Sequence, residues 1–532
     1  MTSDVPPPPA PPVRAGLPAA APVDAPASGR RRRRGLIIGL VVAPLAVVVL
    51  LIGAGAAWFA ANAVRATPPA AGTVMFENPV AVPPLAPSHL EDGVRVFALT
   101  AQQGRTSFVS QGDTPTLGYD GSYLGPTLVA DHGEQVRVDV TNTLPDSTTV
   151  HWHGMHLPAA MDGGPHTPIA AGAVWQPTWK IDQPAATLWY HPHLHGRTRE
   201  QVDAGLAGMF LVRDQEEAAL ALPRDYGVDD FPLIVQDRSF NADGSFAGGL
   251  GMQFDGVLGD TILVNGTVAP YLNVTTEKVR LRLLNGSSAR MYDFGFADGR
   301  EFDLIGTDGG LLEAPVPSTD IPLSPGERAE IVVSLAPGER IALRSNAPDP
   351  ALHAGSASFD VLELRAAGTL DPSPDAPAHL ADIPAPDAGS AVAERTFVMS
   401  GHNINDAQMD LGRADVVATV DTSEVWTVRN DNPLPHSFHV HDMQYRILSI
   451  DGSPPPARLA GYKDTIALEA DREYRLLVRF DDYADATTPY MYHCHLLWHE
   501  DQGMMGQFLV VEPGQQPALT LPEGDSDDHH DH

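Results

Sequence analysis

The most informative part of the sequence is Tyr492-His493-Cys494-His495-Leu496-Leu497-Trp498-His499-Glu500-Asp501-Gln502-Gly503-Met504-Met505, which contains the only cysteine of the chain. Thiolate, imidazole and thioether together are the ligands of a blue electron-transfer copper site. On an extended strand, Cys494 would face one metal while His493 and His495 face the opposite way. The tripeptide therefore predicts two metal sites joined by one short piece of backbone.

Four His-x-His pairs occur in the chain, and one of them spans the cysteine. Residues i and i+2 lie on the same face of a strand, so the two histidines of each pair could bind one metal ion. Imidazole suits copper, zinc, iron and nickel alike, and a single pair is weak evidence. Four pairs together indicate a cluster of several metals. The pairs are His151/His153, His191/His193, His439/His441 and His493/His495.

The composition favours an all-β protein. The 532 residues include 48 Gly and 49 Pro, and short runs of strand-type sequence are separated by Gly, Pro, Asn and Asp. Such repeated strands are typical of sandwiches and barrels. Clear examples are residues 94–99, 135–140, 424–429 and 474–480.

The charge disfavours a nucleic-acid partner, and the cysteine content rules out a disulfide framework. With 34 Lys and Arg against 67 Asp and Glu, the net charge of −33 lacks the basic footprint of a nucleic-acid partner. One cysteine excludes an intramolecular disulfide framework. A lone cysteine is ordinarily a buried inert residue, but the histidines around Cys494 favour a metal ligand.

The N-terminal part predicts export. Residues 1–29 are rich in Pro and Ala and are expected to be disordered in the cytoplasm. In the segment 30–64, a block of arginines precedes 30 uncharged residues, which would span about 45 Å as a helix, more than the roughly 30 Å of a bilayer core. The arginines would keep the N-terminus inside and place the rest outside the cell membrane. We expect a retained transmembrane anchor. A cleaved signal at Ala61-Asn62-Ala63 or a twin-arginine export signal remains open, with a secreted or periplasmic product.

The exported part divides into blocks. A Pro-rich tether over 65–87 leads to a first block, 88–216, and a middle block, 217–370. A Pro/Ala/Asp-rich linker over 371–392 precedes a third block, 393–514, and the acidic, His-containing tail 515–532. The His pairs lie in the first and third blocks, so we expect the metals there.

These motifs resemble those of the multicopper oxidases, a family that includes laccases, bilirubin oxidases and bacterial cuprous oxidases. The resemblance covers residues 90–512 and extends beyond the ligands to 259–266 and 281–286. It implies three cupredoxin-like Greek-key β-sandwich domains, one for each block, with no copper ligand in the middle one.

The resemblance also implies four copper ions. A type 1 copper would be bound by His436, Cys494 and His499, with Met504 as axial ligand, and a type 2 copper by His151 and His439. The coupled type 3 pair would be held by His153, His191, His193, His441, His493 and His495. His195 offers an alternative 193/195 pair, but the Trp-Tyr-His-Pro-His match favours 191/193. His156 and His166 are interpreted as non-ligands, and Met505 as a core residue.

Two carboxylates lie close to the predicted ligands. Asp162 follows the first His pair and Glu500 directly follows His499. Reduction of O2 to water consumes protons, so both are candidate catalytic acids. The alternative is that they only orient a ligand histidine.

The implied activity couples four one-electron oxidations of a small donor to the reduction of O2 to water. The related cuprous oxidases bind substrate Cu(I) through a methionine-rich insert and through an acid and methionine arrangement near the type 1 site. Here residues 340–400 contain a single methionine, Met399, and residues 431–435 lack that arrangement. We therefore expect laccase-like donors, phenols or aromatic amines. Oxidation of Cu(I), Fe(II) or Mn(II) is the alternative, and a copper-sequestering or scaffold protein is a non-enzymatic one. The sequence does not determine the oligomeric state.

Overall fold

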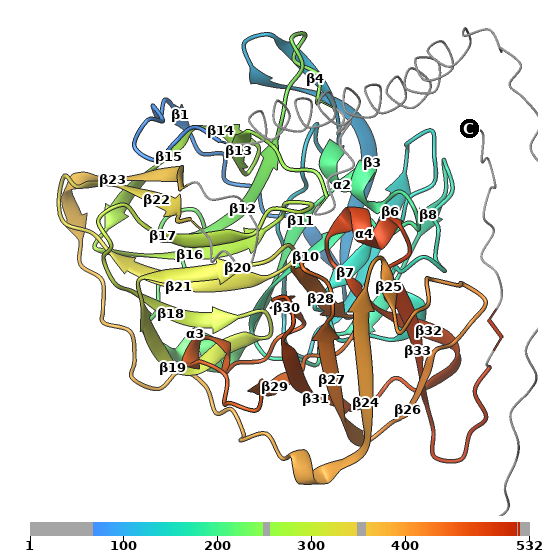
Figure 1. The fold of residues 1–532 in the computed structure, drawn as a ribbon. Coiled ribbons are helices and arrows are strands. Elements are labelled where there is room, and N and C mark those ends of the chain that lie inside the picture. The colour runs from blue at the N-terminus through green and yellow to red at the C-terminus, as the bar shows by residue number, and fades with distance from the viewer. Residues whose placement is uncertain (1–67, 248–255, 348–357, 519, 522–532) are drawn as a thin grey trace, which may run out of the picture. The chain divides into compact units, whose positions relative to one another are not determined.

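A computed structural model describes residues 68–247, 256–347, 358–518 and 520–521. This part of the chain is mostly β-strand and forms three pairs of sheets (Figure 1). No helix within it is long and apolar enough to span a membrane. The predicted anchor over 30–64 and the disordered segment 1–29 lie outside the described residues.

The first sandwich pairs two sheets around a core that includes Leu99, Val138, Leu188 and Phe210. One sheet has the order β2-β3-β6-β8, with β4 on β3 and β9 on β6, and the other has the order β5-β11-β10-β7. The strands are β2 (Ser88–Glu91), β3 (Val94–Val109), β4 (Gly112–Tyr119), β5 (Leu128–Asp131), β6 (Gln135–Asn142), β7 (His151–His153), β8 (Val174–Trp175), β9 (Thr178–Lys180), β10 (Ala186–His191) and β11 (Gly208–Arg213).

The middle sandwich has sheets of order β1-β15-β23-β22-β17-β20 and β14-β13-β12-β16-β21-β18-β19. Leu281, Phe294, Ile331 and Leu362 belong to the core between them. The strands are β1 (Asn78–Pro79), β12 (Asp230–Arg238), β13 (Thr261–Val264), β14 (Thr267–Val268), β15 (Pro270–Thr276), β16 (Lys278–Asn285), β17 (Tyr292–Phe296), β18 (Phe302–Thr307), β19 (Gly310–Ser318), β20 (Asp320–Leu323), β21 (Arg328–Ser334), β22 (Arg340–Ser345) and β23 (Phe359–Asp371).

The C-terminal sandwich has sheets of order β25-β24-β27-β31-β29 and β26-β33-β32-β28-β30, and Cys494 lies in its core. Its strands are β24 (Ala391–Ser400), β25 (Asn403–Ile404), β26 (Val416–Thr419), β27 (Thr422–Asn430), β28 (His436–Val440), β29 (Arg446–Ile450), β30 (Thr465–Leu468), β31 (Glu473–Phe480), β32 (Asp485–Cys494) and β33 (Met505–Val511). The short helices of the described chain are η1 (Ala159–Met161), α2 (Thr198–Ala204), α3 (Gln215–Ala219), η3 (Ala388–Ser390), η4 (Ala457–Leu459) and α4 (Leu497–Asp501).

Alternation of apolar and polar residues explains why these segments form strands. In β6 the buried residues Val136, Val138 and Val140 alternate with partly exposed polar ones. In β31, the buried residues Tyr474, Leu476, Val478 and Phe480 alternate with residues that are partly or largely exposed. A strand with this period buries one face against the opposite sheet of its sandwich.

Strand register brings the predicted ligands together. β7 pairs with β10 so that His151 lies opposite His191. β28 pairs with β32 so that His439 lies opposite His493 and Phe438 lies opposite Cys494. Neighbouring residues on β32 point to opposite faces, so Cys494 enters the core of the C-terminal sandwich while His493 faces the other way.

Parts of the predicted tether, linker and tail pack against the sandwiches. Within the predicted tether, β1 pairs in parallel with β15 of the middle sandwich. Within the predicted linker, Leu380 is buried beside Leu222 and Ile305. In the predicted tail, Leu521 packs against Leu509, and residues 522–532 lie outside the described part of the chain.

Candidate metal centre

The cysteine site is a buried triangle of one sulfur and two imidazole nitrogens. His436 Nδ1 lies 3.3 Å from Cys494 Sγ, and His499 Nδ1 lies 3.6 Å from it. The two nitrogens are 3.2 Å apart. Helix α4 makes this triangle possible because it turns the chain back after Cys494 and returns His499 to the thiol.

Met504 completes the surroundings of this site. Its side chain is fully buried in the same core cluster as Cys494. Its backbone carbonyl accepts a hydrogen bond of 3.1 Å from the Cys494 amide. The next residue, Met505, pairs with His493 in β33 and is also buried. A sulfur, two imidazoles and a nearby thioether are the donor set of a blue copper.

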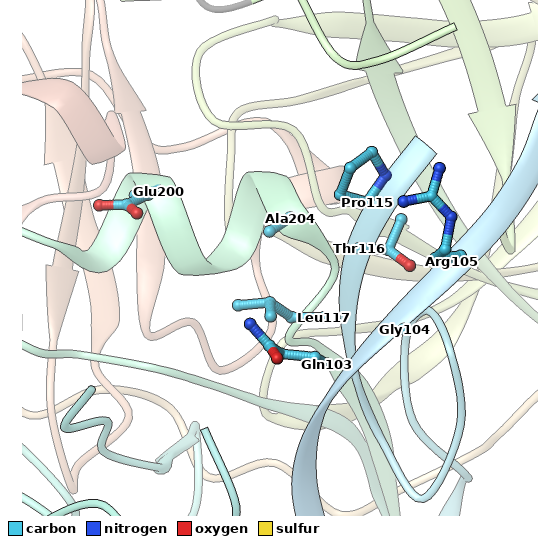
Figure 2. A pocket seen from close by; sticks show the side chains of 8 residues that line it. All are labelled: Gln103, Gly104, Arg105, Pro115, Thr116, Leu117, Glu200 and Ala204. Carbon is cyan, nitrogen blue, oxygen red and sulfur yellow. The ribbon is translucent and has the colours of Figure 1, made fainter. Parts of the chain in front are cut away.

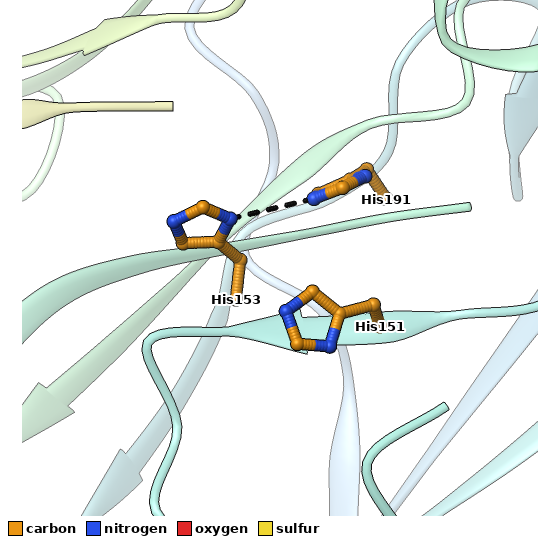
Figure 3. A group of neighbouring side chains, drawn as sticks. All are labelled: His151, His153 and His191. Atoms are coloured by element: carbon orange, nitrogen blue, oxygen red, sulfur yellow. Dashed lines mark hydrogen bonds between the residues drawn. The ribbon is translucent and has the colours of Figure 1, made fainter. Parts of the chain in front are cut away.

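The eight histidines of the four pairs form a second, larger cluster (the histidine cluster), and all eight are buried. Their inward nitrogens approach one another both within a sandwich and between the first and C-terminal sandwiches. His193 Nε2 and His441 Nε2 lie 3.1 and 3.2 Å from His493 Nε2. His151 Nε2 lies 3.5 Å from His439 Nε2. His153 Nδ1 lies 3.4 Å from His191 Nε2 (Figure 3).

The opposite nitrogens of these rings have oxygen partners. Nδ1 of His191, His439 and His493 donates to the carbonyls of Pro192, Asp464 and Cys494 at 2.8, 2.9 and 3.1 Å, respectively. Nδ1 of His151 donates to the carbonyl of Asp162 at 3.0 Å. A neutral imidazole that donates from one nitrogen carries a lone pair on the other. The lone pairs of these rings therefore point into the cluster, as metal ligation requires.

Burial favours the neutral form of most of the cluster imidazoles. It lowers the pKa of His191, His193 and His439 well below the usual range, and neighbouring imidazoles add to the effect. It lowers the pKa of His495 to about 3, and neither ring nitrogen of His495 has a hydrogen-bond partner. Burial also raises the pKa of Cys494 to about 12. Unpartnered buried nitrogens and a buried thiol fit bound metal, since a cation supplies the missing partner and displaces the thiol proton.

Asp162 and Glu500 both contact cluster histidines. The Asp162 carboxylate accepts a 2.7 Å bond from Nδ1 of His441. Glu500 lies 3.3 Å from Nδ1 of His493 and 3.6 Å from Nδ1 of His193, and neither of its oxygens has a hydrogen-bond partner. Burial and the neighbouring Asp501 raise the pKa of Glu500. Asp162 therefore has an orienting contact, whereas the oxygens of Glu500 are left for another partner.

The remaining histidines of these motifs lie outside the histidine cluster. His195 is exposed. His156 lies between Asp442 and Asp482, at 2.8 and 2.7 Å. His166 contacts Gln507. The structure thus assembles the pairs 151/153, 191/193, 439/441 and 493/495 and leaves these three histidines out.

Sequence reasoning missed two charged residues beside the histidine cluster. Asp464 contacts His153 and His439, and Arg328 forms a buried ion pair with Asp464 at 2.6 Å. Both side chains are fully buried. Each is a single charged residue beside strand-type sequence, and no nearby motif indicates that it lies next to the histidine cluster.

A surface pocket of about 600 Å³ lies between the β3–β4 hairpin and α2 (Figure 2). Arg105, Thr116 and Glu200 are among its lining residues. None of the residues that line it belongs to the cysteine site or the histidine cluster, so we assign it no part in the metal chemistry.

The fold and these two sites define a class of copper oxidoreductases built from cupredoxin-like sandwiches. Family profiles described as multicopper oxidase match residues 100–217 and 382–514. The "Multicopper oxidase mco" of Staphylococcus haemolyticus is 34% identical over 446 residues, which are 82% of this chain and 93% of that protein. The chain belongs to the multicopper oxidase family, which confirms the resemblance seen in the sequence.

Other relatives carry different names. "Cell division protein FtsP" of Edwardsiella tarda is 37% identical over 82% of this chain and 93% of its own length. The structure of a bacterial laccase-like multicopper oxidase, CueO from Ochrobactrum sp., has a TM-score of 0.76 and 37% identity, over 81% of this chain and 100% of that one. The structure of a metallo-oxidase from Campylobacter jejuni has a TM-score of 0.73 and 26% identity, over 83% of this chain and 99% of that one.

Proposed function

We propose that this protein is a laccase-like oxidase that couples four one-electron oxidations of a phenol or aromatic amine to the reduction of O2 to water. The observation that carries the proposal is the pairing of inward lone pairs in the histidine cluster, linked through His493-Cys494-His495 to the cysteine site. We assign the type 1 copper to His436, Cys494 and His499 with Met504 axial, and the type 2 copper to His151 and His439. The type 3 pair is assigned to His153, His191, His193, His441, His493 and His495.

Copper, when bound, supplies one-electron chemistry at the thiolate and O2 reduction at the histidine cluster. The residues of the chain hold the two sites at a fixed separation. His493 and His495 flank Cys494 directly, and the main-chain carbonyl of Cys494 accepts from His493 Nδ1 at 3.1 Å. Electrons from the cysteine site therefore have a covalent route of one residue to either imidazole.

The residues at the edge of the cysteine site support the proposal that the electron donor is an aromatic molecule. The ring of His402 lies 4.8 Å from Trp498 and 4.9 Å from His499, centre to centre, and both His402 and Trp498 are half-buried. The side-chain amide of Asn432 lies 2.6 Å from Nε2 of His436. Asp431, the nearby carboxylate, is paired with Arg429 at 2.6 Å. Rings and a neutral amide suit a planar organic molecule better than a metal ion.

Turnover measurements test this proposal. Purified copper-loaded protein should be blue and should consume O2 with a phenol faster than with Cu(I) or Fe(II). Cys494→Ser should abolish the colour and the oxidation of all donors while the copper of the histidine cluster stays bound. Faster turnover of a metal ion would favour the metallo-oxidase alternative, which the Campylobacter jejuni relative exemplifies.

The second candidate is a role without O2 chemistry, as a scaffold or a copper-sequestering protein. Several relatives named as cell division proteins favour it. The complete set of buried ligand atoms argues against it, because a scaffold has no use for eight buried imidazoles gathered in one cluster. Copper-loaded protein that consumes no O2 with phenols or metal ions would support this candidate.

We further propose that the sandwiches work outside the cytoplasm, on a membrane anchor formed by residues 30–64, with O2 and the donor as small-molecule partners and no nucleic acid. The arginine block and the uncharged stretch after it support this location. Fractionation of full-length protein tests it. Recovery in the membrane fraction is expected, and a soluble product that begins near residue 64 would indicate signal cleavage instead.

A further inference from the structure

Asp464 touches one histidine from each side of the histidine cluster. It directly precedes β30, and its side chain is fully buried. Its carboxylate oxygen Oδ1 lies 3.1 Å from Nε2 of His153, which belongs to the first sandwich. Its main-chain carbonyl accepts from Nδ1 of His439 in the C-terminal sandwich at 2.9 Å. One residue therefore contacts the outward nitrogens of two proposed ligands.

His153 is turned the other way from its neighbours in the cluster. His151, His191 and His493 each bond outward through Nδ1. His153 bonds outward through Nε2, and its Nδ1 faces Nε2 of His191. Because neutral imidazole carries one proton, an acceptor at Nε2 is what leaves the lone pair on the inward Nδ1. Oδ1 of Asp464 is such an acceptor, and the hydroxyl of Thr465 lies 3.0 Å from the same nitrogen.

Arg328 holds this carboxylate in place. Nη1 of Arg328 donates to Oδ1 of Asp464 at 2.7 Å, and Nη2 donates to Oδ2 at 2.6 Å. Such a bidentate pair fixes the plane of the carboxylate. Arg328 begins β21 of the middle sandwich, is fully buried and also donates to the carbonyl of Thr187 at 3.0 Å. The sandwich without proposed ligands thus reaches His153 through the Arg328–Asp464 ion pair.

We propose that Asp464, held by Arg328, is a positioning residue of the histidine cluster. Its carboxylate selects Nδ1 as the nitrogen that His153 presents to metal, and its carbonyl selects Nε2 of His439. This inference rests on the proposed copper site. The alternative is that the ion pair only anchors the middle sandwich to the C-terminal one.

Asp464→Asn separates the two roles. The amide cannot present an oxygen to both nitrogens of Arg328 and to His153, so its NH2 group faces either the guanidinium or Nε2 of His153. An N–H at Nε2 favours a lone pair there and moves the imidazole proton to the inward Nδ1. We expect the histidine cluster of this variant to bind copper roughly 10- to 100-fold more weakly. The paramagnetic resonance of the cluster copper should also change, and the blue absorption of the cysteine site should remain.

Glu327→Gln is the matched control. Glu327 is buried in the same charge network, where its carboxylate accepts from the Lys463 ammonium at 2.8 Å and from the Ser324 hydroxyl at 2.7 Å. Among the described residues its carboxylate contacts Lys463 and Ser324 but neither Asp464 nor a cluster histidine, so its loss should lower the melting temperature without changing the copper resonance. Equal copper affinity and equal spectra for the two variants would overturn the positioning role.

Arg328→Lys tests the positioning role of Asp464 if the Asp464→Asn variant does not fold. Lysine keeps the charge but loses the bidentate grip, so a smaller shift of the same resonance is expected, and an unchanged spectrum would contradict the inference. Wild-type protein without copper in the histidine cluster would instead contradict the proposed function. Wild-type protein with copper and unaltered variants would contradict only the role of Asp464.

Discussion

At the scale of single residues, the outward nitrogen of each histidine decides what its inward nitrogen can do. His441 shows this because Nδ1 donates to the Asp162 carboxylate at 2.7 Å while Nε2 approaches His493. Asp162 also accepts from His151 through its main-chain carbonyl at 3.0 Å. This acid therefore orients two imidazoles, which is one of the two roles that the sequence leaves open for it.

Glu500 differs from Asp162 because neither of its buried oxygens has a hydrogen-bond partner, whereas Oδ2 of Asp162 accepts from His441. We expect Glu500→Gln to keep all copper and the blue colour, since the amide has nearly the same shape. O2 reduction should slow on the order of 100-fold, because an amide cannot deliver a proton. Oxygen-electrode assays with a phenol measure the rate. Glu512→Gln, at an exposed position, is the control, and parental turnover by Glu500→Gln would refute the proton role.

At the scale of elements, the short strand β7 depends on a close backbone approach. Gly163 has a φ of +78°, and a Cβ built on it would lie 1.7 Å from the carbonyl oxygen of Val150. Val150 directly precedes His151, the first residue of β7. Glycine is required here both for the left-handed conformation and for the space.

Gly163→Ala should therefore push β7 out of place. We expect a loss of about 2–4 kcal/mol in the free energy of unfolding, from the left-handed conformation and the clash together, and a lower copper content. Gly172→Ala is a matched control with the same φ of +78° and nothing within 4 Å of a built Cβ. It should lose only about 1–2 kcal/mol. Similar melting temperatures for the two variants would show that the contact with Val150 is easily relieved.

At the scale of the whole described chain, charged contacts join sandwiches that are far apart in sequence. His156 follows β7 of the first sandwich, and its partners Asp442 and Asp482 belong to the C-terminal one. The carboxylates of Asp442 and Asp482 raise the pKa of His156 well above its usual range against the effect of burial. The ring of Tyr483 lies 5.0 Å away, centre to centre.

This contact should make stability depend on pH. Because the folded-state pKa is raised above the unfolded value of about 6.5, the stabilisation is complete below that pH and is lost as the pH rises through the folded-state pKa. His156→Gln should cost about 2 kcal/mol at pH 6 and clearly less at high pH. Thermal melting of copper-loaded protein measures both. Asp482→Asn should matter less, because its partly exposed carboxylate is screened by water. Equal effects of His156→Gln at both pH values would contradict the prediction.

The sequence by itself determined the all-β class, the family and the donor types of the proposed metal sites. These follow from local patterns, because strand alternation and His-x-His spacing act over a few residues. The same patterns predicted the group that contains Cys494, and the structure places its sulfur within 3.3 Å of His436. They left the choice between the 191/193 and 193/195 pairs to a motif match, and they said nothing of Asp464 or Arg328.

Only the tertiary structure decided which nitrogen each histidine turns inward and which acids hold the rings. His153 and Asp464 are 311 positions apart, and Arg328 and Asp464 are 136 apart. No local spacing encodes a contact of that range, because it exists only when the sandwiches pack and exclude water from the ion pair. Short motifs thus supply the donor atoms of the proposed metal sites, and the packing of all three sandwiches sets the orientation of those side chains.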